Sequence, residues 1–130
     1  MAKKAPELKA WDRRPWPDNG DPDPQITFAA VGEALSHWEH LEGLIASLFA
    51  SFVSDHADYV PAKRAYVAVR TFEGRMEMLR ASAEAFFDAF PDKDVQDTYQ
   101  TFLKSVKEFA PHRNDIAHGV VAEFYRKIAN

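Results

Sequence analysis

Residues 28–52, FAAVGEALSHWEHLEGLIASLFASF, decide the fold of this chain. Large apolar side chains recur in this stretch every three or four residues, the spacing of one face of an α-helix. They are Phe28, Val31, Leu35, Trp38, Leu41, Ile45, Leu48 and Phe52. Asp23 and Pro24 precede the stripe, and a capping residue followed by proline is typical of a helix N-terminus. The sequence therefore predicts a long amphipathic helix that begins at Asp23-Pro24 and ends before a loop at 54–60.

The same spacing predicts three more helices, separated by prolines. The second opens at Pro61 and ends at Pro91, the third is capped by Asp92 or Asp94 and ends at Pro111, and the fourth runs from about Arg113 to Lys127. The second helix carries Tyr66, Val69, Phe72, Met76, Leu79, Ala83, Phe86 and Phe90 on its stripe, and the third carries Val95, Tyr99, Phe102, Val106 and Phe109. No segment reads as a strand.

Four amphipathic helices with short connections predict an all-α fold, a four-helix up-and-down bundle. The first two helices would each hold about 28 residues and extend roughly 40 Å. Because the last two would be shorter, part of the long pair would stay uncovered. We expect that apolar surface to form the interface of a homodimer.

The length and composition of the chain limit the classes of protein to which it can belong. The chain has 130 residues, which suits one domain, and 46% of them are hydrophobic, which is enough for a core. It has no cysteine, so disulfides and thiolate metal sites are excluded. It also lacks a run of about 18 apolar residues and the apolar core of a signal peptide, so we expect a cytoplasmic protein without a membrane span.

Residues 1–23 differ from the rest of the chain and divide it into an N-terminal arm and a helical domain at 24–130. Four of the eight prolines lie in the arm, which excludes a stable helix there. Trp11 and Trp16 also lie in it. The segment is either a disordered tail or an extended arm whose tryptophans dock on the body or on a partner subunit.

The stretch 113–119, RNDIAHG, carries the residues best suited to chemistry. Arginine binds phosphate, and histidine transfers protons near neutral pH. Around them, Ile116, Ala117, Val120, Val121 and Phe124 read as one apolar helix stripe. The pattern predicts that Arg113 and Asn114 stand at the start of a helix, where backbone N–H groups and the helix dipole favour an anion.

An arginine, a polar residue, three further residues and a histidine resemble the signature of the HEPN family. Arg113, Asn114 and His118 carry the resemblance. It implies a small helical fold and, for many members, a metal-independent ribonuclease or the toxin of a toxin–antitoxin pair. One HEPN subgroup has a tyrosine two residues after the histidine, where this chain has Val120, so the chain is not assigned to that subgroup.

Arg113 and His118 are five residues apart, which places them about 140° apart around an ideal helix. Either the arginine reaches over from the helix start, or it acts with the histidine of a second subunit, as the resemblance implies. Each residue also has a structural interpretation. Arg113 would pair with Glu108 or Asp115, Asn114 would cap the helix, and His118 would make a structural hydrogen bond. Gly119 inside a helix would indicate close approach of another backbone.

A competing group lies in the first predicted helix, at Glu33, His37, His40 and Glu42. Glu33 and His37 have the i, i+4 spacing that can chelate a metal. Because His40 is about 60° off that line, we favour a solvated helix face and expect no metal and no cofactor. The resemblance to HEPN proteins, whose first helix often supplies a polar residue, implies that Glu39 or Glu42 lines the same cleft as Arg113. His112 is a second candidate proton donor.

These observations favour a metal-independent endoribonuclease with Arg113, Asn114 and His118 as its catalytic set. Its expected partners are RNA as a transient substrate, a second copy of the chain and a cognate antitoxin protein, with neither DNA nor a membrane. The net charge of −4 opposes a broad grip on nucleic acid. The alternative is a catalytically silent HEPN-like dimeric module that binds a partner protein or a nucleotide.

Overall fold

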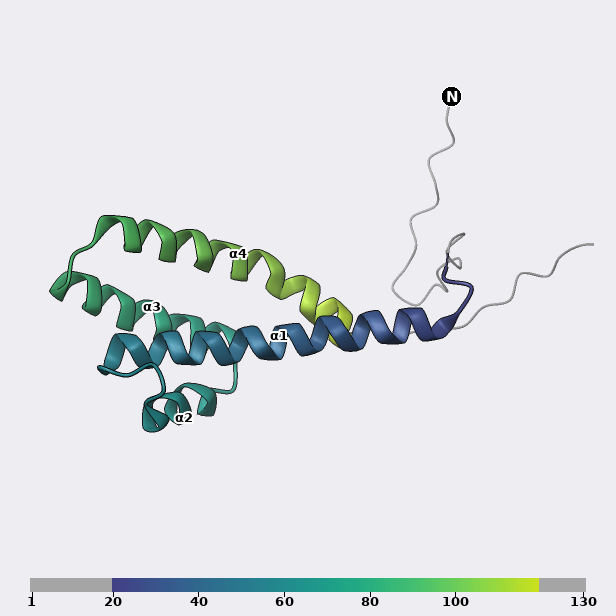
Figure 1. Ribbon diagram of the computed structural model, residues 1–130, viewed down its shortest axis with the longest axis horizontal. Helices are drawn as coiled ribbons and strands as arrows, with labels where there is room; N and C mark the ends of the chain where they lie inside the picture. Colours follow the sequence, from purple (N-terminus) through teal and green to yellow (C-terminus); the bar gives the residue numbers. More distant parts are fainter. Residues whose placement is uncertain (1–19, 120–130) are drawn as a thin grey trace, which may run out of the picture.

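The structure, a computed structural model, describes residues 20–119. This part of the chain holds four helices and no strand: α1 (Pro24–Val53), α2 (Val60–Ala68), α3 (Phe72–Ala89) and α4 (Lys93–His118). Successive helices run in opposite directions (Figure 1). The predicted all-α helical bundle is confirmed. The predictions for residues 1–19 and for the end of the last helix, beyond residue 119, lie outside the described residues.

The predicted start of α1 is confirmed, and its cause is local. The Asp23 side chain accepts a hydrogen bond from the backbone N–H of Gln25 at 2.9 Å, and Pro24 occupies the first turn. The helix ends at Val53, and Ser54 donates its hydroxyl to the carbonyl of Ala50 at 2.7 Å. The loop predicted to follow the first helix is therefore where the sequence places it.

The second predicted helix is wrong in one respect, because it is two helices with a break at 69–71. Val69 has an extended backbone, and Thr71 caps a new helix by accepting a hydrogen bond from the N–H of Gly74 at 3.1 Å. A side chain at position 74 would place its Cβ 2.9 Å from the Thr71 hydroxyl oxygen and 2.9 Å from a Val69 methyl carbon. Gly74 thus leaves room for the break. The break was not predicted because the apolar stripe keeps its regular spacing across residues 69–71.

The third and fourth predicted helices are also wrong, because they form one helix. α4 continues through Pro111 to His118. A proline inside a helix removes one hydrogen bond, here the one to the carbonyl of Lys107. Because Lys107 is exposed, water can satisfy that carbonyl. Val106 and Arg113, on either side of the proline, both face α1, which holds the two parts of the helix in line.

The core lies where all four helices meet. α1 packs against each of the other three helices. The aromatic rings of Phe52, Phe86, Phe87 and Tyr99 lie with centroids 5.2–5.9 Å apart, and the buried side chains continue along all four helices. The core residues are Trp38, Ile45, Ala46, Phe49, Ala50, Ala62, Tyr66, Met76, Leu79, Ala83, Phe87, Tyr99, Leu103 and Val106. We call this region the packed end.

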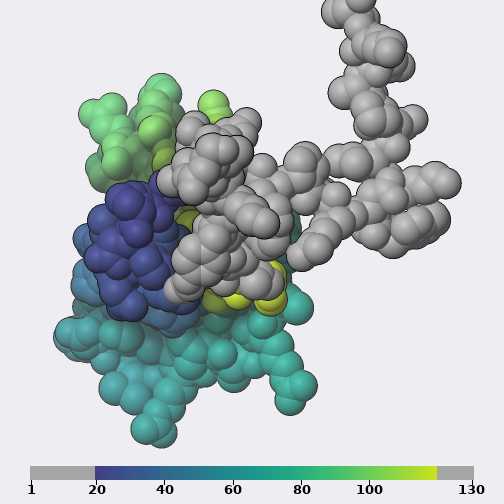
Figure 2. Space-filling model, turned by 90° about the vertical axis from the view of Figure 1, so that its right-hand side faces the viewer, coloured from purple at the N-terminus to yellow at the C-terminus, as the bar shows by residue number. Residues whose placement is uncertain are grey.

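The other end of the bundle has fewer layers. The first turns of α1 extend past the start of α3 and past the end of α4, whose last turns lie beside the following part of α1 (Figure 1). Figure 2 looks onto this end and shows the start of α1, in purple, on the same side of the molecule as the end of α4, in yellow. Phe28 is 49% exposed and Phe109 is 62% exposed. We call this region the open end.

Candidate functional site

The stretch 113–118 forms the last turns of α4, so the prediction that it begins a helix is wrong. Gly119 caps the C-terminus with an extended backbone, and its N–H donates to the carbonyl of Ile116 at 3.4 Å. A helix C-terminus carries partial negative charge and favours cations. Arg113 and His118 therefore stand at the favourable end of the dipole and not at a helix start, whose free N–H groups could bind an anion. An anion bound at this helix end would be held by side chains such as that of Arg113.

Arg113 is half-buried and lies against α1. Its Nη1 donates to the side-chain oxygen of Asn114 at 3.2 Å, and its Nε is shielded from solvent without a hydrogen-bond partner in the described part of the chain. Glu108, one of its expected partners, instead lies 3.9 Å from the Nζ of Lys104. Asn114 thus positions the guanidinium and does not cap a helix. The remaining donors of Arg113 can reach an anion.

His118 lies apart from Arg113 within one copy of the chain. It is exposed and does not line the hollow that Arg113 lines. Because both residues stand on one regular helix, the five-residue spacing keeps them about 140° apart. The structure brings Arg113 and Asn114 together and leaves His118 outside. Within one copy of the chain, the three residues do not converge on one site.

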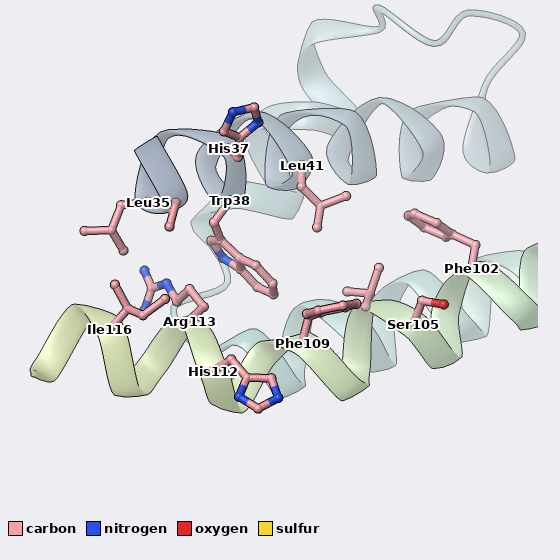
Figure 3. A pocket seen from close by; sticks show the side chains of 12 residues that line it. Leu35, His37, Trp38, Leu41, Phe102, Ser105, Phe109, His112, Arg113 and Ile116 are labelled. Atoms are coloured by element: carbon pink, nitrogen blue, oxygen red, sulfur yellow. The ribbon is translucent and has the colours of Figure 1, made fainter. Parts of the chain in front are cut away.

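A groove of about 360 Å³ separates α1 from the second half of α4, and Arg113 closes one end of it. Figure 3 shows Trp38 and Leu41 pointing from α1 toward α4, and Phe109 and Arg113 pointing from α4 toward α1. The walls are almost wholly apolar and include Leu35, Phe102, Val106 and Ile116. The rings of His37 and His112 lie at its margins, on the outer sides of α1 and α4.

A partly buried ion pair fixes the wall of the groove. The indole N–H of Trp38 donates to Glu42 at 2.7 Å, and the other carboxylate oxygen of Glu42 lies 2.8 Å from the Nη2 of Arg75. The side chains of Glu42 and Arg75 are each 18% exposed. Phe72 packs on the indole, with ring centroids 5.7 Å apart. Glu42 was expected to line the cleft, but its carboxylate instead holds Trp38 in place.

The acidic and histidine residues at the start of α1 do not gather around a common point. Glu33 and His37 approach to 3.6 Å, with both side chains about three-quarters exposed. His40 and Glu39 are exposed and outside the groove. Within residues 20–119, no three His, Asp or Glu side chains are grouped so that they could hold a metal ion. The arrangement is that of a solvated helix face.

The groove was not predicted from the sequence. Phe102, Val106, Phe109, Arg113 and Ile116 are spaced by four, three, four and three residues, which is one helix face. This face runs straight through Pro111, so reading the proline as a break divided it in two. The signal was present, and it identifies Arg113 as a residue of the α1-facing stripe.

Comparisons with known proteins assign no family. The chain matches no family model, no curated protein and no solved structure. The resemblance to HEPN domains therefore rests on Arg113, Asn114 and His118, with the all-helical organisation as weaker support. Separately, no helix in the part of the chain that the structure describes has the length and hydropathy needed to cross a bilayer.

Proposed function

We propose that this chain is a HEPN-like endoribonuclease that works without a metal, as a homodimer, in the manner of a toxin with a cognate antitoxin. One observation carries the proposal. A half-buried arginine, oriented by its neighbour Asn114 at 3.2 Å, shares the end of one helix with an exposed histidine. The pair supplies a phosphate-binding cation and a proton-transfer group.

The reaction that suits these groups is transesterification within RNA. The ribose 2′-oxygen attacks the adjacent phosphorus, its proton passes to a base, and the bond to the 5′-oxygen of the next nucleotide breaks as that oxygen is protonated. The products are a 2′,3′-cyclic phosphate and a free 5′-hydroxyl. His118 acts as the general base or acid. Arg113 stabilises the negative charge that grows on the phosphoryl oxygens, because a guanidinium stays protonated and is a poor base.

The position of His118 explains why the proposal requires two copies of the chain. Within one copy, the helix holds Arg113 and His118 about 140° apart. A second copy that packs its open end against the first would bring its own His118 toward this Arg113. The exposed apolar side chains in the first turns of α1, Ile26 and Phe28, support such an interface. Each dimer would then contain two composite sites.

A different observation favours the alternative, a catalytically silent module that binds a partner protein or a nucleotide. Arg113 closes a groove with almost wholly apolar walls. Pockets of this kind, with one charged group, are typical of binding sites for apolar molecules or side chains. The net charge of −4 also opposes tight RNA binding. In this alternative, His118 has no role in chemistry.

The first test is cleavage of mixed RNA by the purified protein in EDTA. The wild type should produce cyclic phosphate ends, and His118→Ala should lower the rate by about 10² or more, the usual scale for a general acid or base. Arg113→Ala should cause a similar loss, whereas His40→Ala, a matched change on the exposed face of α1, should leave the rate unchanged. Cleavage that requires magnesium, or that survives His118→Ala, contradicts the proposal.

A second test examines the composite site. Arg113→Ala and His118→Ala proteins are each inactive alone, and are then mixed under conditions that let subunits exchange. Half of the dimers would be mixed, and each of these would hold one intact site, so the activity should recover to about a quarter of the wild-type level. No recovery despite exchange shows that both residues act within one copy. No cleavage by the wild type, together with saturable binding of a nucleotide or protein, favours the alternative.

A further inference from the structure

The groove between α1 and α4 is an apolar site without an occupant among residues 20–119. Trp38, Leu41, Phe109 and Ile116 contribute to its walls, and Arg113 closes one end. Phe109 is 62% exposed and Ile116 is 37% exposed. Removing exposed apolar surface of this kind from water lowers the free energy of the protein. The question is which group covers it.

A hydrogen bond holds Asp21, which precedes α1, against the side of that helix. The hydroxyl of Thr27 donates to the carboxylate of Asp21 at 2.7 Å, although Asp21 precedes Thr27 by six residues. Asp21 therefore lies beside the first turns of α1. From Thr27 to Leu35, at the near end of the groove, α1 rises about 12 Å. Trp16 stands five residues before Asp21, and five extended residues span up to about 17 Å. Trp16 can therefore reach Leu35.

The sequence of the arm complements this groove. Trp16 lies between two prolines, Pro15 and Pro17, and proline restricts the backbone so that less entropy is lost when such a segment docks. Proline-rich segments bind aromatic-lined grooves for this reason. Asp18 follows two residues later, and its carboxylate could pair with Arg113, whose Nε has no hydrogen-bond partner within residues 20–119. A tethered segment also has a high effective concentration at its own groove.

We propose that the N-terminal arm of the same chain occupies the groove, with the Trp16 indole between α1 and α4 and Asp18 beside Arg113. The arm is then an internal strap that joins the two helices of the open end. This inference does not depend on RNA cleavage.

The absence of native cysteine permits a direct test in the full-length chain. A spin label is attached to a cysteine introduced as Arg14→Cys, two residues before Trp16, and the methyl signals of Leu35, Leu41 and Ile116 are recorded by NMR. Those signals should fall by more than half. The methyl signals of Leu79, at the packed end, should keep their intensity. Equal, slight losses at both ends overturn the proposal.

Matched variants assign the effect to one side chain. In the labelled chain, Trp16→Ser should restore the groove signals, whereas Trp11→Ser should leave them broadened. The reverse result overturns the assignment to Trp16. A spin label at Lys127→Cys that alone broadens the groove signals identifies residues 120–130 as the occupant and overturns the proposal.

The remaining alternative is that the arm of a second copy of the chain occupies the groove. A mixture of spin-labelled protein without isotope and isotope-labelled protein without a spin label reports only contacts between chains. The groove signals should be unaffected in this mixture. Broadening there that matches the loss in the doubly labelled chain shows that the arm is exchanged between copies, and overturns the intrachain strap.

Discussion

The packed end and the open end are built from the same two long helices and differ in what covers them. At the packed end, α2 and α3 complete the layers around α1, and Leu79 and Ala50 are 0% exposed. At the open end, the groove remains between α1 and α4, and α3 contacts only its inner wall, through Phe72 and Arg75. The apolar stripes continue through both ends. Neighbouring helices, not the stripes, therefore decide which apolar residues are buried, and the candidate catalytic residues stand where burial is incomplete.

The largest expected effect separates the two ends by stability. Leu79→Ala removes a fully buried side chain and should lower the free energy of unfolding by about 3 kcal/mol or more. Phe109→Ala, at the open end, should lower it by no more than about 1 kcal/mol because the ring is mostly exposed. Urea unfolding measures both variants. Equal losses would show that the open end is packed as firmly as the core.

A second effect depends on pH and belongs to the packed end. Burial, opposed by Arg75 and reinforced by Glu42, raises the pKa of Tyr66 to about 12. A pKa that is higher in the folded state than in the unfolded state stabilises the fold fully below the unfolded value and loses this stabilisation as the pH rises through the folded one. Stability should therefore fall between about pH 10 and about pH 12, by roughly 2–3 kcal/mol in total.

The control for this pH effect is Tyr66→Phe, which keeps the ring and removes the titrating hydroxyl. Unfolding in urea at a series of alkaline pH values should show a flatter dependence for this variant than for the wild type. The same slope in both proteins would assign the alkaline loss to other groups.

A third effect concerns the boundary between the two ends, where Glu42 joins Trp38 to Arg75. Glu42→Gln should lower the free energy of unfolding by about 2 kcal/mol, because it leaves a mostly buried guanidinium without its charged partner. Glu33→Gln, which alters an exposed pair with His37, should have almost no effect. Thermal unfolding of both variants measures the difference. Comparable shifts would mean that the Glu42 pair is no stronger than a surface pair.

The smallest effect concerns the start of α3. Thr71→Ala removes the cap of α3 and should cost about 1 kcal/mol, while Thr71→Ser should keep most of the stability. Gly74→Ala should also destabilise, because the added Cβ meets Thr71 and Val69. The melting temperature measures each change. A rise in melting temperature for Gly74→Ala would indicate that α2 and α3 merge into one helix without strain.

The sequence was sufficient for features that depend on local chemistry. Asp23 with Pro24, and Asp92 as a cap that accepts from the N–H of Val95, mark helix starts that the structure confirms. The sequence also predicted that apolar side chains at helical spacing form the core, and Trp38, Ile45, Met76 and Leu79 are buried. These features follow from residues close together in the chain.

The errors arise where tertiary packing overrides a local signal. Pro111 is a strong local breaker, yet α4 passes through it because Val106 and Arg113 are both held against α1. The break before Thr71 is concealed because the stripe keeps its spacing on both sides. The candidate site shares this weakness. The sequence identified Arg113 and Asn114, which the structure places together, but the position of the motif at a helix C-terminus depends on whether a proline ends the helix.

The groove also has a consequence for the order in which the molecule assembles. Leu35 and Ile116 both line the groove although about 80 residues of sequence separate them, so placing the end of α4 beside the first half of α1 closes a long loop. The contacts of α1 with α2 and α3 close much shorter loops and form at lower entropic cost. The open end should therefore be the last part of the bundle to form and the first to separate during unfolding. Substitutions at Ile116 should consequently alter the unfolding rate far more than the folding rate.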